Sequence, residues 1–198
     1  MTRPPGLRAR VGILISGHGS NMEALIRAAE DPACAYEVAV VISNRPDAAG
    51  LERARALGIT ALAVDHAPFG KDREAHEHAL DAALRRFGCE YVALAGYMRL
   101  LTPFLVEAWA GRMVNIHPSL LPRHPGLDTH RRAIEAGDAE HGCSVHLVTI
   151  GVDEGPVIAQ AAVPILPGDT SETLAARVLA EEHRLYPAAL REYVASPT

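Results

Sequence analysis

The chain has 198 residues, of which 48% are hydrophobic and 22% charged, with a formal net charge of −5. This length predicts one domain with a sizeable buried core. The acidic balance argues against a broad nucleic-acid surface, which needs clustered Lys and Arg. No run approaches the ~20 apolar residues of a membrane span, and residues 1–10 lack a signal-peptide apolar run. Three widely spaced cysteines make a disulfide framework improbable, so we expect a cytoplasmic protein.

The predicted elements alternate between short apolar strands and helices. We expect strands at 11–16, 37–43, 60–65, 91–96 and 111–117, and helices at 21–30, 46–58 and 71–88. Gly58 and Gly88 end two of these helices, as glycine commonly does. The alternation predicts an α/β fold, a mostly parallel twisted sheet with helices on both faces.

The last third of the chain has a different pattern. Residues 143–150 and 156–165 are two strand-like runs, joined by "GVDEG", which we expect to be antiparallel or irregular additions to the sheet. A helix over 171–194 follows, and Pro187 is expected to kink or interrupt it. We therefore divide the chain into a flexible arm, 1–10, and a single domain, 11–195.

A glycine-rich loop follows the first strand and contains Gly17, Gly19, Ser20 and Asn21. Glycines let the backbone approach a ligand, and free N–H groups at a helix start favour an anion. Met22 occupies the third glycine position of a dinucleotide fingerprint, and no Lys-Ser/Thr pair of a P-loop follows. A monophosphate site fits better, although a simple helix-capping turn stays an alternative.

The segment "VNIHPSLLPRHPG" places Asn115 and His117 at the end of a predicted strand. Side chains two residues apart in a strand share a face, and Pro118 favours an extended conformation at His117. A carboxamide donor and an imidazole suit an oxyanion intermediate of acyl transfer. Asp153 is the best carboxylate to orient His117, with Glu154 as competitor. Ordinary loop roles for the pair remain the alternative.

Other chemistries fit the sequence less well. Ser119 lies near His117, but the chain has no G-x-S-x-G elbow of a serine hydrolase. Cys143 and His146 would face opposite sides of a strand, so we expect no metal. We interpret the remaining loop or helix-end histidines as solvated: His66, His124, His130 and His141.

Taken together, several stretches resemble the folate-dependent phosphoribosylglycinamide formyltransferase family. They include "ISGHGSNMEALI", "LAGYMRLL", "RMVNIHPSLLPRHPGLDTH", "GCSVHLVT", "DEGPVIAQ" and "EEHRLYP", in the family's order and spacing. The resemblance runs from Val11 to about Tyr193. It implies a Rossmann-like fold and formyl transfer from 10-formyltetrahydrofolate to glycinamide ribonucleotide in de novo purine biosynthesis, with no metal.

The resemblance also implies roles for individual residues. Asn115, His117 and Asp153 match the catalytic trio, and it implies a cis peptide at Leu121–Pro122. The ribonucleotide-binding positions are Gly19, Ser20, Asn21 and Glu182. The folate-binding positions are Arg73, Met98, Arg99, Leu100, Leu101, Asn115, Thr149, Ile150, Gly151, Val152 and Asp153. His18 and Leu179 depart from the residues often seen in relatives.

Three other activities were weighed. A formyltetrahydrofolate deformylase would use a similar trio with water as acceptor, and it is the main alternative. A methionyl-tRNA formyltransferase is expected to carry a further C-terminal domain and a different first loop. A non-catalytic folate or ribonucleotide sensor would not need an intact trio. The sequence leaves monomer and homodimer open.

Overall fold

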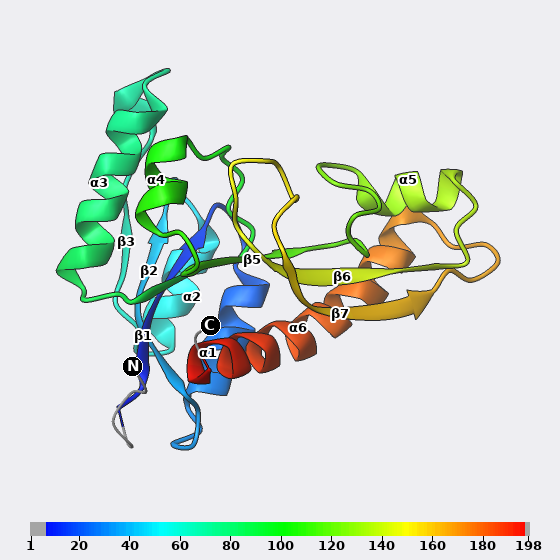
Figure 1. The fold of residues 1–198 in the computed structure, drawn as a ribbon, viewed down its shortest axis with the longest axis horizontal. Helices are drawn as coiled ribbons and strands as arrows, with labels where there is room; N and C mark the ends of the chain where they lie inside the picture. The colour runs from blue at the N-terminus through cyan, green and yellow to red at the C-terminus, as the bar shows by residue number, and fades with distance from the viewer. Residues whose placement is uncertain (1–6, 197–198) are drawn as a thin grey trace.

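The chain folds around one seven-stranded sheet, shown by a computed structural model that describes residues 7–196 (Figure 1). Its strands are β1 (Ala9–Ile15), β2 (Tyr36–Ser43), β3 (Ala61–Ala63), β4 (Tyr91–Leu94), β5 (Met113–His117), β6 (Glu140–Leu147) and β7 (Val157–Pro164). Its helices are α1 (Ser20–Ala29), α2 (Ala49–Ala56), α3 (Arg73–Arg86), α4 (Pro103–Ala108), α5 (Thr129–Glu135) and α6 (Ser171–Ala195), with a 3-10 turn η1 (Ala67–Phe69). The α/β prediction is confirmed.

The strand order is β3-β2-β1-β4-β5-β6-β7. Strands β1 to β5 are all parallel to one another. Strand β6 is antiparallel to both of its neighbours, β5 and β7. The two late runs are therefore antiparallel strands of the same sheet. Figure 1 shows β6 and β7 extending to one side, with the first part of α6 beside them.

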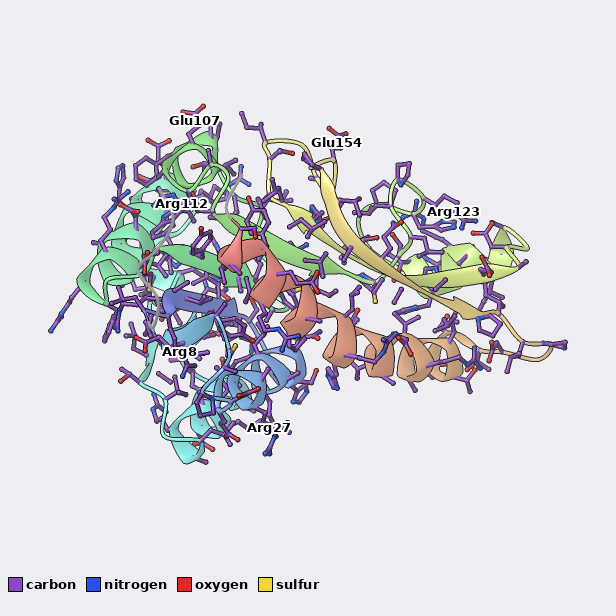
Figure 2. The ribbon with its side chains drawn as sticks, turned by 60° about the horizontal axis from the view of Figure 1, so that its bottom comes forward. Arg8, Arg27, Glu107, Arg112, Arg123 and Glu154 are labelled. Carbon is purple, nitrogen blue, oxygen red and sulfur yellow. The ribbon has the colours of Figure 1, made fainter. Side chains whose placement is uncertain are left out.

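The two faces of the sheet carry separate cores because successive strand residues point to opposite sides. In β1, Ile13 and Ile15 pack with α1, α2 and α6, while Leu14 belongs to the cluster beneath α3 and α4. Helices thus cover both faces of the parallel part, which explains its near-continuous apolar strands. Figure 2 shows α6 running across the face turned to the viewer.

Several element boundaries differ from the sequence predictions. β1 begins at Ala9, inside the expected arm 1–10, and residues 1–6 of that arm lie outside the described residues. Helix α2 begins only at Ala49. Helix α6 continues through Pro187 rather than being interrupted. The cost of the one backbone hydrogen bond that proline cannot donate is outweighed by the burial of the helix face that carries Tyr186 and Leu190.

The sheet topology creates a place for ligands. Strand order reverses between β1 and β4, and open α/β sheets bind ligands beyond the carboxyl ends of strands at such a point. The glycine-rich loop leaves β1 there, and residues 95–101 leave β4 beside it. Their contact is direct, because the Ser16 hydroxyl accepts a hydrogen bond of 2.8 Å from the Met98 backbone N–H.

Candidate active site

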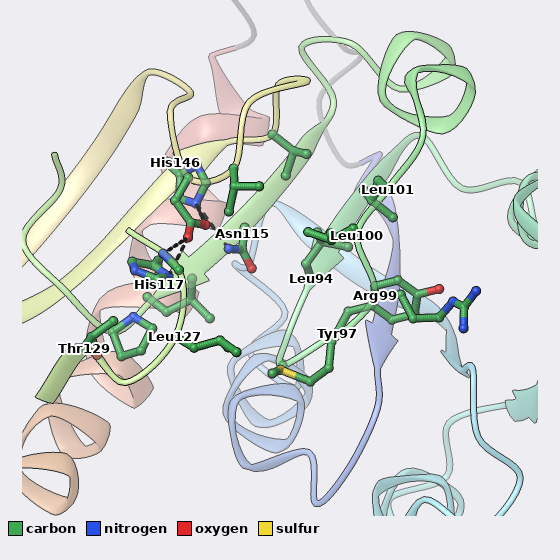
Figure 3. Close-up of a pocket in the computed structure, with 18 of the residues that line it drawn as sticks. Leu94, Tyr97, Arg99, Leu100, Leu101, Asn115, His117, Leu127, Thr129 and His146 are labelled. Carbon is green, nitrogen blue, oxygen red and sulfur yellow. Dashed lines mark hydrogen bonds and ion pairs between the residues drawn. The ribbon is translucent and has the colours of Figure 1, made fainter. Parts of the chain in front are cut away.

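A cavity of about 750 Å³ opens along the carboxyl ends of β4 and β5 (Figure 3). Its lining is mostly apolar, with polar groups converging at one end, as is typical of small-molecule sites. Five separate segments contribute: the loops after β4, after β5 and after β6, and the helices α1 and α6. Residues far apart in sequence therefore meet at this one site.

Asn115 and His117 both line the cavity, as their alternation along β5 predicts. Asn115 is half-buried, and His117 is only 6% exposed. Asp153 approaches His117 from the β6–β7 loop, with its Oδ2 lying 3.2 Å from the imidazole Nδ1. Asp153, rather than Glu154, is thus the carboxylate that reaches His117, and it adopts a left-handed backbone conformation with φ 55°.

The ionisation of this pair reflects opposing effects. Burial is the largest effect on His117 and leaves its pKa lowered, although the His124 carbonyl and the Asp153 carboxylate act in the other direction. Burial pushes the pKa of Asp153 upward, but the nearby His146 ring, the hydrogen bond from the Gly126 N–H and the nearby His117 outweigh it and leave that pKa lowered. Asp153 therefore remains an acceptor at neutral pH and keeps His117 oriented.

His146 is a site residue that the sequence reasoning missed. It lies opposite Asn115 in the antiparallel β5–β6 pair, and its Nε2 is 3.2 Å from Asn115 Nδ2 and 3.5 Å from Asp153 Oδ1. Its Nδ1 donates to the Leu147 carbonyl at 2.9 Å, so the neutral ring accepts from Asn115 through Nε2. This bond orients the amide and leaves its second N–H free for a ligand.

The glycine-rich loop meets the start of α1 as expected. Gly19 precedes the helix with φ 75°, a conformation that favours glycine. In the described chain no side chain caps this helix, so first-turn N–H groups are available to an anion. Ser20 is the first residue of α1. The neighbouring Asn21 lines the cavity and donates from Nδ2 to Glu182 Oε2 at 2.7 Å.

Glu182 comes from α6 and retains only 6% exposure. Burial raises its pKa, and the bond from Asn21 partly opposes that shift. The bonded polar pair Asn21 and Glu182 therefore lines the cavity from α1 and α6. His18 is exposed in the glycine-rich loop, and Leu179, one turn before Glu182, is 37% exposed.

The expected folate-binding segments come from the loops after β4 and after β6. All of their residues line it: Met98, Arg99, Leu100, Leu101, Thr149, Ile150, Gly151, Val152 and Asp153. Arg73 does not line it. Its Nη1 instead lies 3.5 Å from the Leu100 carbonyl, a long contact at the outer side of that loop. The apolar side chains of the two loops after β4 and β6 are unusually exposed, with Met98 at 67% and Ile150 at 64%.

The loop after β5 contains a further group of missed lining residues, Leu127, Asp128, Thr129 and His130. It also contains the expected cis peptide at Leu121–Pro122, which is confirmed. The solvated interpretation of His141 is wrong, since it is 1% exposed and lies in β6 against His130. His124 is likewise mostly buried, with its side chain 13% exposed.

Residues 7–196 contain no group of three or more potential ligand side chains placed to hold a metal ion. No helix in that range has the length and hydropathy needed to cross a membrane.

This combination of a Rossmann-like sheet, a glycine loop and an Asn-His-Asp site defines a known class. The formyl transferase family model matches residues 9–190, and the chain belongs to that family. It is 49% identical over 175 residues to phosphoribosylglycinamide formyltransferase of Escherichia coli, covering 88% of this chain and 82% of that protein.

Two further similarities are informative. The solved phosphoribosylglycinamide formyltransferase of Brucella melitensis superposes with a TM-score of 0.91 at 54% identity, covering 97% of this chain and 98% of that one. The trifunctional purine biosynthetic protein adenosine-3 of Drosophila melanogaster is 48% identical over 185 residues, covering 92% of this chain. The chain spans only 14% of that longer relative.

Proposed function

We propose that the protein transfers the formyl group of 10-formyltetrahydrofolate to the amine of glycinamide ribonucleotide. The products are formylglycinamide ribonucleotide and tetrahydrofolate, in de novo purine biosynthesis. The observation that carries this proposal is the position of Asn115, His117 and Asp153 in one cavity, which Asn21 of α1 and a set of apolar loops also line. The similar proteins named phosphoribosylglycinamide formyltransferase support it.

The ribonucleotide is proposed to occupy the end formed by α1 and α6. Gly19, Ser20 and Asn21 would hold the phosphate through first-turn N–H groups and side-chain donors. Glu182 would accept from a sugar hydroxyl while remaining bonded to Asn21. This arrangement points the amine of the ribonucleotide toward the carboxyl end of β5. The overall charge of −5 gives no general attraction to a phosphate, so this local geometry must supply it.

The folate is proposed to occupy the apolar end. Met98, Leu100, Ile150 and Val152 are more than half exposed and are placed to cover a flat aromatic ring. Arg73 would assist from outside the cavity, either by supporting the Leu100 loop or by pairing with a carboxylate of the ligand. When bound, the folate supplies the formyl group.

The chain's own residues then perform the chemistry. The free Asn115 N–H donates to the formyl oxygen as negative charge develops there. His117 in its protonated form would stabilise the same charge, and Asp153 orients it through Nδ1. As the new bond from the amine to the formyl carbon forms, Asp153 would relay the amine proton to the folate nitrogen, whose bond to the formyl carbon breaks. His146 holds the Asn115 amide in place. A rigid strand end suits this role, because small misplacements are costly to catalysis.

The competing hydrolase makes a different prediction for one assay. Release of tetrahydrofolate from the formyl donor should require glycinamide ribonucleotide and should yield formylated ribonucleotide in equal amount. Equal release without the ribonucleotide would identify a deformylase and leave the glycine loop a structural turn. Binding of both ligands without release would identify a sensor. Small-molecule substrates, a cytoplasmic location and either a monomer or a homodimer remain part of this proposal.

A further inference from the structure

The second ring nitrogen of His117 has a partner of its own. Its Nε2 lies 3.0 Å from the backbone carbonyl oxygen of His124, seven residues further along the chain. A carbonyl only accepts, so Nε2 carries a proton in this arrangement. Since Asp153 also accepts at Nδ1, both ring nitrogens face acceptors. These two acceptors favour the imidazolium form, but burial outweighs them and leaves the pKa of His117 lowered.

The position of the His124 carbonyl depends on the His124 side chain. His124 has φ 53°, a left-handed conformation that is uncommon for residues other than glycine. Its Nε2 lies 2.7 Å from Asp138 Oδ2, just after α5, and the two side chains are 13% and 19% exposed. The bond from His124 lowers the pKa of Asp138, which keeps that carboxylate ionised. The side-chain bond thus holds a strained backbone position.

The segment 124–126 contacts both members of the proposed catalytic pair. While His124 accepts from His117, the Gly126 N–H donates to Asp153 Oδ2 at 2.9 Å. Upstream, the Ser119 hydroxyl donates to the Arg123 carbonyl at 2.7 Å and closes the intervening loop. A shift of this segment would therefore disturb the imidazole and the carboxylate together.

We propose that His124, anchored by Asp138, is a positioning residue that fixes the second hydrogen-bond acceptor of His117. This inference rests on the proposed function for its effect on turnover, but not for its effect on the His117 ring. His124 itself does not contact the substrates in this role. It acts through its backbone carbonyl, with Asp138 as its support.

Several charged groups surround this arrangement and enter any pH measurement. Around His117 they are Asp153, His146, His130 and Arg132, and around His124 they are Asp138, Arg123 and His141. Among these groups, Asp138 can be altered without changing residue 124 or its backbone preference. It therefore gives the cleanest variant.

The test compares D138A, D138N and H124L with the unchanged protein and with H78L, a histidine loss on the exposed face of α3. The His117 ring is titrated by ¹⁵N NMR on histidine-labelled protein without substrates. D138A and H124L should lower the pKa of His117 by about one, because the hydrogen bond from the charged His117 ring to the His124 carbonyl becomes weaker. D138N keeps an acceptor oxygen for His124 and should stay near the original pKa, as should H78L.

Turnover gives the second measurement. D138A and H124L should lower kcat by roughly tenfold to a hundredfold with little change in KM, while D138N recovers most of it. A folded D138A with unchanged His117 pKa and unchanged kcat would overturn the proposal. If D138A or H124L does not fold, a fully active D138L or H124F that folds would overturn it equally. If the unchanged protein transfers no formyl group but D138A and H124L still lower the pKa of His117, the positioning role stands and only the proposed function is refuted.

Discussion

Replacing Asn115 by Ala tests the proposed oxyanion donor most directly. The side chain makes one hydrogen bond to protein, from Nδ2 to His146 Nε2, and its other N–H is free in the cavity. The backbone of residue 115 is held by Leu94 on one side and His146 on the other, and neither pairing needs the amide. Activity and stability should therefore respond very differently to this change.

The two magnitudes can be worked separately. Loss of one neutral hydrogen bond costs about 1 kcal/mol of folding free energy, which lowers Tm by roughly 2–4 °C for a chain of this size. Loss of one oxyanion donor lowers kcat by about 10²–10³-fold, or roughly 3–4 kcal/mol in the barrier. N115D should be worse than N115A, because a carboxylate cannot donate and would repel the developing charge.

The assay is initial-rate formyl transfer at saturating concentrations of both substrates, alongside a thermal melt. I13V is a suitable control, since Ile13 is fully buried in β1 away from the cavity and the change costs about 0.5–1.5 kcal/mol. It should match the stability loss of N115A and keep full turnover. N115A with a kcat within threefold of the unchanged protein would refute the assigned role of Asn115.

Three further predictions concern other parts of the molecule. Burial lowers the pKa of His141 to about 4, so the folded state binds fewer protons than the unfolded state between that pH and about 6.5. Unfolding free energy should therefore fall as pH drops through this window, by up to about 3 kcal/mol, and denaturant titrations of a folded H141L should show a flatter pH dependence. E182A should raise the KM for the ribonucleotide by about tenfold or more. E182Q keeps an acceptor for Asn21 and should raise it less. Equal KM values for the two variants would contradict this role of Glu182. G50A should also raise the KM for the ribonucleotide. A Cβ at residue 50 would lie 3.0 Å from the Gly17 carbonyl oxygen and 2.5 Å from the Ile15 side chain, and would displace the glycine loop. An unchanged KM would show that the loop adapts.

Much of the fold could be predicted because the parallel strands are fully buried and their apolar runs are distinct. Helix α4 was missed although Thr102 precedes Pro103, a pair typical of a helix start. With only six residues, α4 has too little periodicity to stand out. Helix α5 has seven residues and begins after Asp128 in a left-handed conformation, for which the sequence offers no clear signal.

The candidate site was predictable to the extent that it depends on local sequence. Alternation along β5 places Asn115 and His117 on one face, and that holds in the structure. The roles of His146 and of the Gly126 N–H depend on which strand pairs with β5 and on how the following loop closes. Such non-local pairings are set by tertiary packing, so residue spacing alone could not reveal them.

The exposed apolar loops of the cavity have a practical consequence for handling the protein. Met98, Leu100, Leu127, Ile150 and Val152 each leave half or more of their surface in water. Contiguous apolar surface of this kind promotes self-association in concentrated solution. A flat aromatic ligand seated there would remove it from water and, by mass action, also favour the folded chain. Storage with a folate analogue should therefore reduce turbidity during concentration, and light scattering with and without the analogue would measure the benefit.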